Sequence, residues 1–266
     1  MHDDGLIHFE AEGVELPPNP TEYGYVTSDG ALIWFAAFGS GQPVILLHGG
    51  LGHAGNWGAQ VPALVEAGYR AVVIDSRGHG HSTRDERPYS YAVMAEDVIA
   101  VMNTLQIERA AFVGWSDGAV IALLLADKYP ERAAGVLYFA CNVDPSGAKD
   151  FEMTPVIGRC LSRHVKDYQR FSATPDDFDA FSEAVDEMQR TQPNLSAEDL
   201  ARIRVPLTVL HSEHDEFITR EHAEYLARTI PGAAFAYMAG VSHFAPVQRP
   251  EVFNQELMRF LKKVSG

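Results

Sequence analysis

The sequence predicts an α/β fold built on a mostly parallel sheet of eight strands, with helices on both faces of the sheet and a helical insertion. Short apolar runs of strand type, among them 44–47, 71–74 and 110–113, alternate with stretches whose apolar residues recur at helical spacing. This alternation is typical of parallel strands joined by right-handed crossover helices. The length of 266 residues suits one domain with an insertion and is enough to bury a large core.

The individual elements follow from the same patterns. Residues 1–21 are acidic and contain the breaker Pro17-Pro18-Asn19-Pro20, so we expect an extended arm there. Ser28-Asp29-Gly30 lies between two strand-like runs, which predicts a β-hairpin. The expected strands are 22–27, 32–38, 44–47, 71–74, 110–113, 136–140, 206–210 and 233–238. The expected helices outside the insertion are 57–67, 91–105, 119–129, 220–229 and 250–263.

The segment 142–201 interrupts this alternation because it lacks any β-branched run. Helix-like stretches at 150–171 and 176–191 dominate the segment, and Thr174-Pro175 separates them. The expected organisation is therefore an N-terminal arm at 1–21, an α/β core formed by 22–141 and 202–266, and a helical insertion at 142–201.

Composition narrows the classes of partner and compartment. The net charge of −15 argues against nucleic acid and anionic membranes as partners, because both need cationic protein surfaces. No apolar run reaches membrane-spanning length, and the start Met1-His2-Asp3-Asp4 lacks the pattern of a signal peptide. Two cysteines, Cys141 and Cys160, do not make a disulfide framework. We therefore expect a cytoplasmic protein and make no prediction of its oligomeric state.

The run Gly114-Trp115-Ser116-Asp117-Gly118 lies between a predicted strand and a predicted helix. A serine between two glycines at such a turn is the pattern of a nucleophile elbow. The glycines let the strand and helix backbones pass close to the serine, and the helix N-terminus directs free N–H groups toward whatever is bound to it. The run predicts Ser116 as a nucleophile, provided that a base, an acid and an oxyanion loop lie nearby.

Those three groups follow other predicted strands. His48-Gly49-Gly50 comes directly after the third strand and can direct a backbone N–H at a carbonyl oxygen. The acidic run Glu213-His214-Asp215 lies just beyond the seventh strand, and Ser242-His243 lies just beyond the eighth. Because the carboxyl ends of parallel strands meet at one edge of a sheet, we expect the serine, an acid and the histidine to lie together.

Over most of its length the chain resembles the α/β-hydrolase superfamily. The matching motifs are His48-Gly49-Gly50, Asp75-Ser76-Arg77-Gly78-His79-Gly80-His81-Ser82, Gly114–Gly118, His214-Asp215 and Ser242-His243. The chain order of serine, aspartate and histidine is that of this superfamily and differs from the orders of chymotrypsin and subtilisin. The resemblance implies a cofactor-free serine hydrolase in which residues 142–201 form a helical cap over the active site.

The resemblance also implies the catalytic triad. Ser116 is the expected nucleophile, and His243 is the base that takes its proton and then protonates the leaving group. Asp215 occupies the usual position of the acid after the seventh strand and would hold His243 in the right tautomer. Glu213 and Glu216 are the alternatives to Asp215.

The remaining site residues belong to the loops around the serine. We expect the oxyanion hole to consist of the backbone N–H groups of Asp117 and Gly50, with Leu51 as the alternative to Gly50. Leu51, Trp115, Asp117 and Cys141 lie near the catalytic loops in sequence, so we expect them to contact a small-molecule substrate. The expected reaction is cleavage of an ester, thioester, lactone or amide through an acyl-enzyme.

Asp117 is unusual beside a nucleophile and has two interpretations. Gly-Trp-Ser-Asp-Gly resembles the biphenyl-hydrolase-like (valacyclovir hydrolase) branch, in which the acid after the nucleophile recognises an α-amino group; this implies an amino-acyl ester as substrate. An acid in the first turn of a helix also complements the helix dipole. Both interpretations stay open at this point.

Two other functions and a metal site are alternatives to hydrolysis. Gly50-x-Gly52-x-x-Gly55 with Asp75 fits a dinucleotide fingerprint of an NAD-dependent oxidoreductase, but that function leaves Ser116 and His243 unexplained. A fold of this class can also serve as a signalling receptor or regulatory binding protein, which very slow turnover would reveal. A metal site at His211, His214 and Asp215 lacks companion ligands, so we expect no metal.

Overall fold

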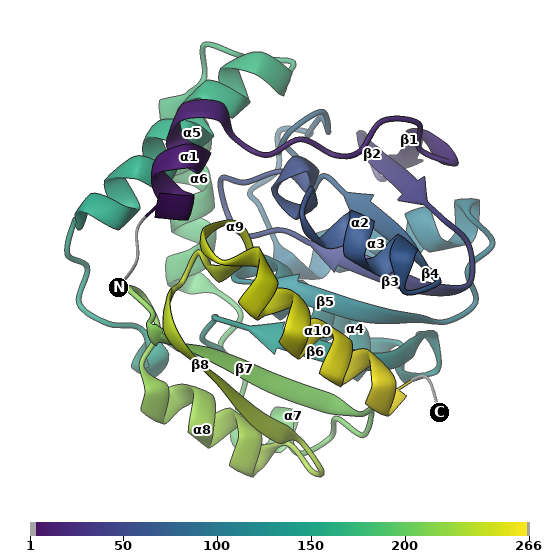
Figure 1. Ribbon diagram of the computed structural model, residues 1–266, viewed down its shortest axis with the longest axis vertical. Helices are drawn as coiled ribbons and strands as arrows, with labels where there is room; N and C mark the ends of the chain where they lie inside the picture. The colour runs from purple at the N-terminus through teal and green to yellow at the C-terminus, as the bar shows by residue number, and fades with distance from the viewer. Residues whose placement is uncertain (1–3, 265–266) are drawn as a thin grey trace.

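Eight strands form one sheet in the order β1-β2-β4-β3-β5-β6-β7-β8 in the computed structural model, which describes residues 4–264 (Figure 1). The strands are β1 (Glu22–Ser28), β2 (Ala31–Phe38), β3 (Gln42–Leu47), β4 (Tyr69–Ile74), β5 (Ala110–Trp115), β6 (Ala133–Phe139), β7 (Leu207–His214) and β8 (Ala234–Ser242). β2 runs antiparallel to β1 and β4, and the pairs from β4 through β8 are parallel. The predicted mostly parallel sheet of eight strands is confirmed.

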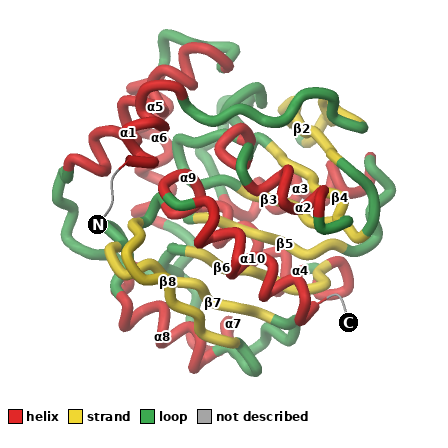
Figure 2. Tube along the Cα trace, in the orientation of Figure 1, coloured by secondary structure: helices red, strands yellow, loops and turns green. Residues whose placement is uncertain are grey.

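Helices cover both faces of this sheet. The helices α3 (Tyr91–Thr104), α4 (Asp117–Lys128) and α8 (Arg220–Thr229) supply apolar side chains to the buried cluster on one face. The helices α2 (Gln60–Glu66) and α10 (Pro250–Val264) pack on the other face, where α10 crosses in front of the strands in Figure 2. The site residues at the strand ends are therefore carried by a scaffold that is packed on both sides.

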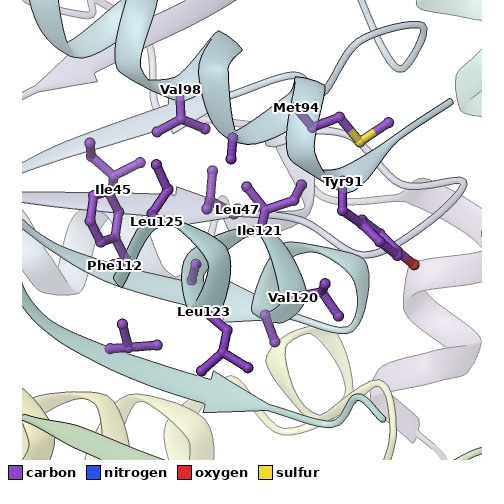
Figure 3. Close-up of a cluster of buried hydrophobic side chains, with 14 of the residues drawn as sticks. Ile45, Leu47, Tyr91, Met94, Val98, Phe112, Val120, Ile121, Leu123 and Leu125 are labelled. Carbon is purple, nitrogen blue, oxygen red and sulfur yellow. The ribbon is translucent and has the colours of Figure 1, made fainter. Parts of the chain in front are cut away.

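The core between α3, α4 and the sheet shows why these segments are helical. Tyr91, Met94 and Val98 recur along one face of α3 and are all buried. They belong to the same buried cluster as Ile121 of α4 and the strand residue Leu47 (Figure 3). Tyr91 lies at the edge of the cluster, and its hydroxyl points away from the apolar side chains.

Helices fill the insertion between β6 and β7. They are α5 (Pro155–Phe171), α6 (Phe178–Thr191) and the short α7 (Ala197–Leu200). α5 begins at Pro155, later than the helical stretch expected from residue 150, because the Thr154 side chain caps it and Pro155 suits the first helical turn. Residues 150–153 are consequently free of helix and form part of the rim of the site described below.

The N-terminal arm differs from the expectation. Residues 1–3 lie outside the described residues, and the chain then forms a helix, α1 (Asp4–Glu12), where an extended segment was expected. Leu6 and Phe9 of this helix are fully buried among α5 and the short helix α9 (Ala245–Gln248), and Figure 1 shows α1 beside α5. Burial of two large side chains outweighs the weak local pattern of this short segment.

The helix expected at 57–67 is also divided. A 3-10 turn ends at Trp57, and α2 begins only at Gln60. The N-terminal segment crosses this point so closely that a Cβ on Gly58 would lie 2.2 Å from the carbonyl oxygen of Glu15. This close approach leaves no room for a side chain at position 58.

Candidate active site

Ser116 occupies the turn between β5 and α4, with φ of 53° and ψ of −123°. This positive φ is a conformation that a residue with a side chain adopts only at a cost. A Cβ on Gly114 would lie 2.2 Å from the carbonyl oxygen of Gly118, and a Cβ on Gly118 would lie 2.1 Å from that of Leu47. Both glycines of the motif are thus required by space, and the strained turn presents Ser116 at the carboxyl edge of the sheet.

His243 lies directly after β8, and its Nδ1 is 3.1 Å from Oδ1 and 3.2 Å from Oδ2 of Asp215. The Asp215 carboxylate also accepts the backbone N–H groups of Phe217 and Ile218, each at 2.9 Å. Burial opposes the charge of Asp215, but the His243 ring and these two donors hold the pKa of its carboxyl below the ordinary value. A charged Asp215 favours the tautomer with the proton on Nδ1, which leaves Nε2 of His243 free to act as a base.

The two alternative acids have other partners. Glu213 accepts the backbone N–H of Gly240 at 2.7 Å, and Glu216 accepts the backbone N–H of His243 at 2.9 Å. Burial raises the pKa of Glu216. Both glutamates therefore fix the backbone around the histidine, and the carboxylate at its ring is that of Asp215.

Aromatic rings surround the imidazole of His243. Phe217 packs edge-on against it with ring centres 4.7 Å apart, and Phe244 does the same at 5.3 Å. Trp115, of the elbow strand, lies 6.3 Å from it. These contacts restrict the ring to the orientation in which Nδ1 meets Asp215.

The loop after β3 lies against the serine. A Cβ on Gly49 would be 3.1 Å from the Cβ of Ser116. His48 holds this loop in place, because its Nε2 accepts the backbone N–H of Ser76 at 3.0 Å and its Nδ1 lies 2.8 Å from the Gly49 carbonyl oxygen. Gly50 follows at once, and Asp117 is the first residue of α4, whose N–H groups lack partners within the helix. The arrangement can hold an oxyanion beside Ser116.

Asp117 is buried and has partners that sequence analysis did not find. It accepts a hydrogen bond from the Tyr91 hydroxyl of α3 at 2.9 Å and from the Gln189 amide of α6 at 3.0 Å. Burial raises the pKa of its carboxyl to about 6, although both hydrogen bonds lower it. Tyr91 and Gln189 were missed because they are distant in sequence and belong to no motif; the only signal was the unusual acid itself.

A cavity of about 980 Å³ lies between this edge of the sheet and the helices α5 and α6 of the insertion, which we expect to act as a cap. Its wall includes Ser116, His243, the predicted oxyanion residue Gly50 and the four residues predicted to contact substrate, which are Leu51, Trp115, Asp117 and Cys141. The cap contributes apolar side chains, among them Ile157, Leu161, Phe178 and Val185. This volume is at the upper end of the range for small-molecule sites.

Cys141 has no reactive thiolate in this setting. Burial raises the pKa of its thiol well above the ordinary value, and the negative charge of Asp117 acts in the same direction. A nucleophilic cysteine needs the opposite, a lowered pKa. The Cys141 thiol therefore does not have the environment of a nucleophilic cysteine.

The loop with the pattern Gly50-x-Gly52-x-x-Gly55 does not have the geometry of a dinucleotide-binding site. Asp75, which would have to reach a ribose, is fully buried and accepts the backbone N–H groups of Ala54 at 2.6 Å and His81 at 2.8 Å. The Asp75 carboxylate thus connects the loop at Ala54 with the loop at His81. Among residues 4–264, histidine, cysteine and acidic side chains nowhere gather in threes as a metal site would require.

A profile of the alpha/beta hydrolase family matches residues 44–256, and the chain belongs to this family. It is similar to the serine hydrolase BPHL of Mus musculus, with 24% identity over 89% of this chain and 85% of the relative. None of the helices in the described part of the chain is long and apolar enough to span a membrane.

Two solved structures show the same fold. Est816, described as an N-acyl homoserine lactone degrading enzyme, has a TM-score of 0.71 and 27% identity over 89% of this chain and 100% of its own. A thermophilic esterase from Thermogutta terrifontis has a TM-score of 0.70 and 23% identity over 91% of this chain and 99% of its own.

Proposed function

We propose that the protein is a cofactor-free serine hydrolase that cleaves a carboxylic ester or lactone of a small molecule through an acyl-enzyme. The observation that carries the proposal is the contact between His243 Nδ1 and Asp215 at the cavity that Ser116 also lines. Similarity to the serine hydrolase BPHL and to the lactone-degrading Est816 supports it. Thioesters and amides can react by the same chemistry.

The proposed reaction has two steps. Ser116 attacks the carbonyl carbon while its proton passes to His243 Nε2, and the negative charge on the carbonyl oxygen is held by the N–H groups of Asp117 and Gly50. His243 then gives the proton to the leaving oxygen, and the alcohol departs from the acyl-enzyme. A water molecule, deprotonated by His243, attacks the acyl carbon; His243 then returns this proton to the Ser116 oxygen as the acid is released.

Hydrolysis by the Ser116→Ala variant tests the proposal. We expect kcat for p-nitrophenyl acetate to fall by a factor on the order of 10⁴ or more, with the fold retained, because removal of one oxygen atom costs little packing at a partly exposed turn. Wild-type protein should release many equivalents of nitrophenol per chain. A release that stops near one equivalent would instead identify a signalling receptor or regulatory binding protein.

A more specific substrate, an amino-acyl ester, is favoured by the environment of Asp117. Its carboxylate lies at the cavity, and the Tyr91 hydroxyl and the Gln189 amide that donate hydrogen bonds to it are uncharged. A buried carboxylate with neutral partners is stabilised by a cation that binds next to it. The α-amino group of a substrate would supply that cation close to the reacting carbonyl.

Paired substrates test this specificity. Amino-acyl esters should exceed their N-acetylated counterparts in kcat/KM by on the order of ten- to several-hundred-fold. Asp117→Asn should remove the preference while simple acetate esters are cleaved at a similar rate. Equal rates for free and acetylated amines in the wild type would leave Asp117 with its helix-dipole role alone.

A further inference from the structure

Two large apolar side chains are exposed at the rim of the cavity. Phe151 is 68% exposed and Met153 is 55% exposed, and both belong to the cavity wall together with Lys149. The intervening Asp150 and Glu152 lie outside that wall. This alternation is that of an extended segment, which directs its apolar side chains toward the cavity and its carboxylates toward solvent.

The segment from Lys149 to Met153, called the rim segment below, is held by hydrogen bonds at both ends. At its start the backbone N–H of Lys149 donates to the carbonyl oxygen of Phe217 at 2.7 Å, and the N–H of Thr219 donates to that of Gly147 at 3.0 Å. At its end Thr154 accepts the N–H of Ile157 and caps α5. The apolar pair is thus held at a defined place relative to the proposed triad.

Phe151 and Met153 lie on the side of the cavity where His243 is found. Phe217, to which the segment is hydrogen-bonded, packs against the imidazole of His243, and the Lys149 ammonium donates to the backbone oxygen of Asp215 at 2.6 Å. In the proposed mechanism His243 protonates the departing oxygen, so the alcohol half of the ester lies beside the imidazole. The rim therefore adjoins the alcohol half, whereas the proposed oxyanion residue Asp117 is joined to α6 through Gln189.

We propose that Phe151 and Met153 bind the alkyl chain of the alcohol half of the substrate, which makes esters of medium-chain aliphatic alcohols the preferred class. The inference rests on the proposed function. A chain that leaves the reacting centre past His243 would cover the exposed apolar surface of both side chains. The carboxylates of Asp150 and Glu152 and the net charge of −15 disfavour an anionic lipid surface as the occupant.

Two isomeric esters test which half of the substrate the rim binds. Hexyl acetate and ethyl hexanoate have the same composition but carry the chain on the alcohol and on the acyl side respectively. In the double variant Phe151→Ser/Met153→Ser, the ratio of kcat/KM for hexyl acetate to that for ethyl hexanoate should fall on the order of 10-fold. Phe151→Leu/Met153→Leu should keep the wild-type ratio because it keeps the apolar contact.

The chain offers a matched control on β1. Tyr23 and Tyr25 have the same spacing and similar exposures of 71% and 53%, and they lie outside the cavity wall. Tyr23→Ser/Tyr25→Ser should leave the ratio unchanged. A Phe151→Ser/Met153→Ser variant that keeps the wild-type ratio would overturn the rim assignment alone. So would a variant that loses more activity on ethyl hexanoate than on hexyl acetate. A wild type that cleaves p-nitrophenyl acetate but neither alkyl ester would also overturn the rim assignment alone, whereas one that cleaves none of the three would contradict the proposed function.

Discussion

The Asp117 carboxylate accepts hydrogen bonds from the Gln189 amide at 3.0 and 3.1 Å and so joins α4 to α6 of the insertion. A Cβ on Gly50 would lie 2.4 Å from the Gln189 nitrogen and 2.6 Å from an Asp117 oxygen. Glycine at position 50 thus leaves room for this link beside the proposed oxyanion loop. Burial raises the pKa of the Asp117 carboxyl and so makes the stability of the fold depend on pH.

Asp117 should make the protein less stable as the pH rises. The pKa of its carboxyl is about 6 in the fold and about 4 in an unfolded chain, so the fold binds the proton more tightly. The contribution of Asp117 to the free energy of unfolding should therefore fall between about pH 4 and pH 6 and level off above. In Asp117→Asn this contribution is absent, so the stability of the variant relative to wild type should rise across that window by up to about 3 kcal/mol.

Urea denaturation of both proteins at several pH values measures this difference, and the comparison cancels groups that titrate in both. A difference that stays constant from pH 4 to pH 7 would contradict the raised pKa.

Asp215→Asn should lower kcat for ester hydrolysis by a factor on the order of 10⁴, because an amide N–H directed at His243 favours the wrong tautomer. Glu216→Gln should cost far less, since the amide oxygen of glutamine still accepts the His243 backbone N–H. Steady-state kinetics at neutral pH measures both. The opposite ranking of the two variants would move the acid to Glu216.

Gly118→Ala should abolish folding or activity, because its Cβ would collide with the backbone oxygen of Leu47. Gly158, inside α5, is the matched control: nothing lies within 4 Å of a Cβ built there. Gly158→Ala should raise the free energy of unfolding by roughly 0.5–1 kcal/mol through helix propensity. Thermal melts of both variants check the contrast, and a stable, active Gly118→Ala would show that the elbow can widen.

Phe9→Ala should lower the free energy of unfolding by about 3–5 kcal/mol, because Phe9 is fully buried where α1 packs on α5 and α9. Ile7 lies on the same helix but is 49% exposed, so Ile7→Ala should change stability by less than about 0.5 kcal/mol. Guanidinium denaturation measures the free energy of unfolding of both variants. Equal, small effects would mean that α1 contributes little to the fold.

The sheet and its connections were predictable because their signals are local. Val44–Leu47 and Ala110–Val113 are short apolar runs next to turn motifs, and both lie within observed strands. The helix Arg220–Thr229 has the predicted bounds. Within such elements neighbouring residues decide the conformation.

Features that depend on distant contacts were not predictable. The α1 helix exists because Leu6 and Phe9 are buried against α5 and α9, and no local pattern reveals those partners. The same holds for the site: the motifs indicated Ser116 and His243, whereas the hydrogen bond from Gln189 to Asp117 joins residues 72 positions apart. Residues 142–201 contain no sequence motif, so the sequence alone does not indicate that the Gln189 side chain reaches the cavity.

The most direct test of the proposed function is the position of a fluorophosphonate adduct. The protein is treated with the probe, digested, and the modified peptide is sequenced by mass spectrometry, with Ser116→Ala as the control. We expect one adduct, on Ser116 in the peptide that contains Gly114–Gly118, and none in the control. An adduct on another residue, or ester hydrolysis that persists in the unlabelled Ser116→Ala protein, would contradict the assignment of Ser116 as the nucleophile.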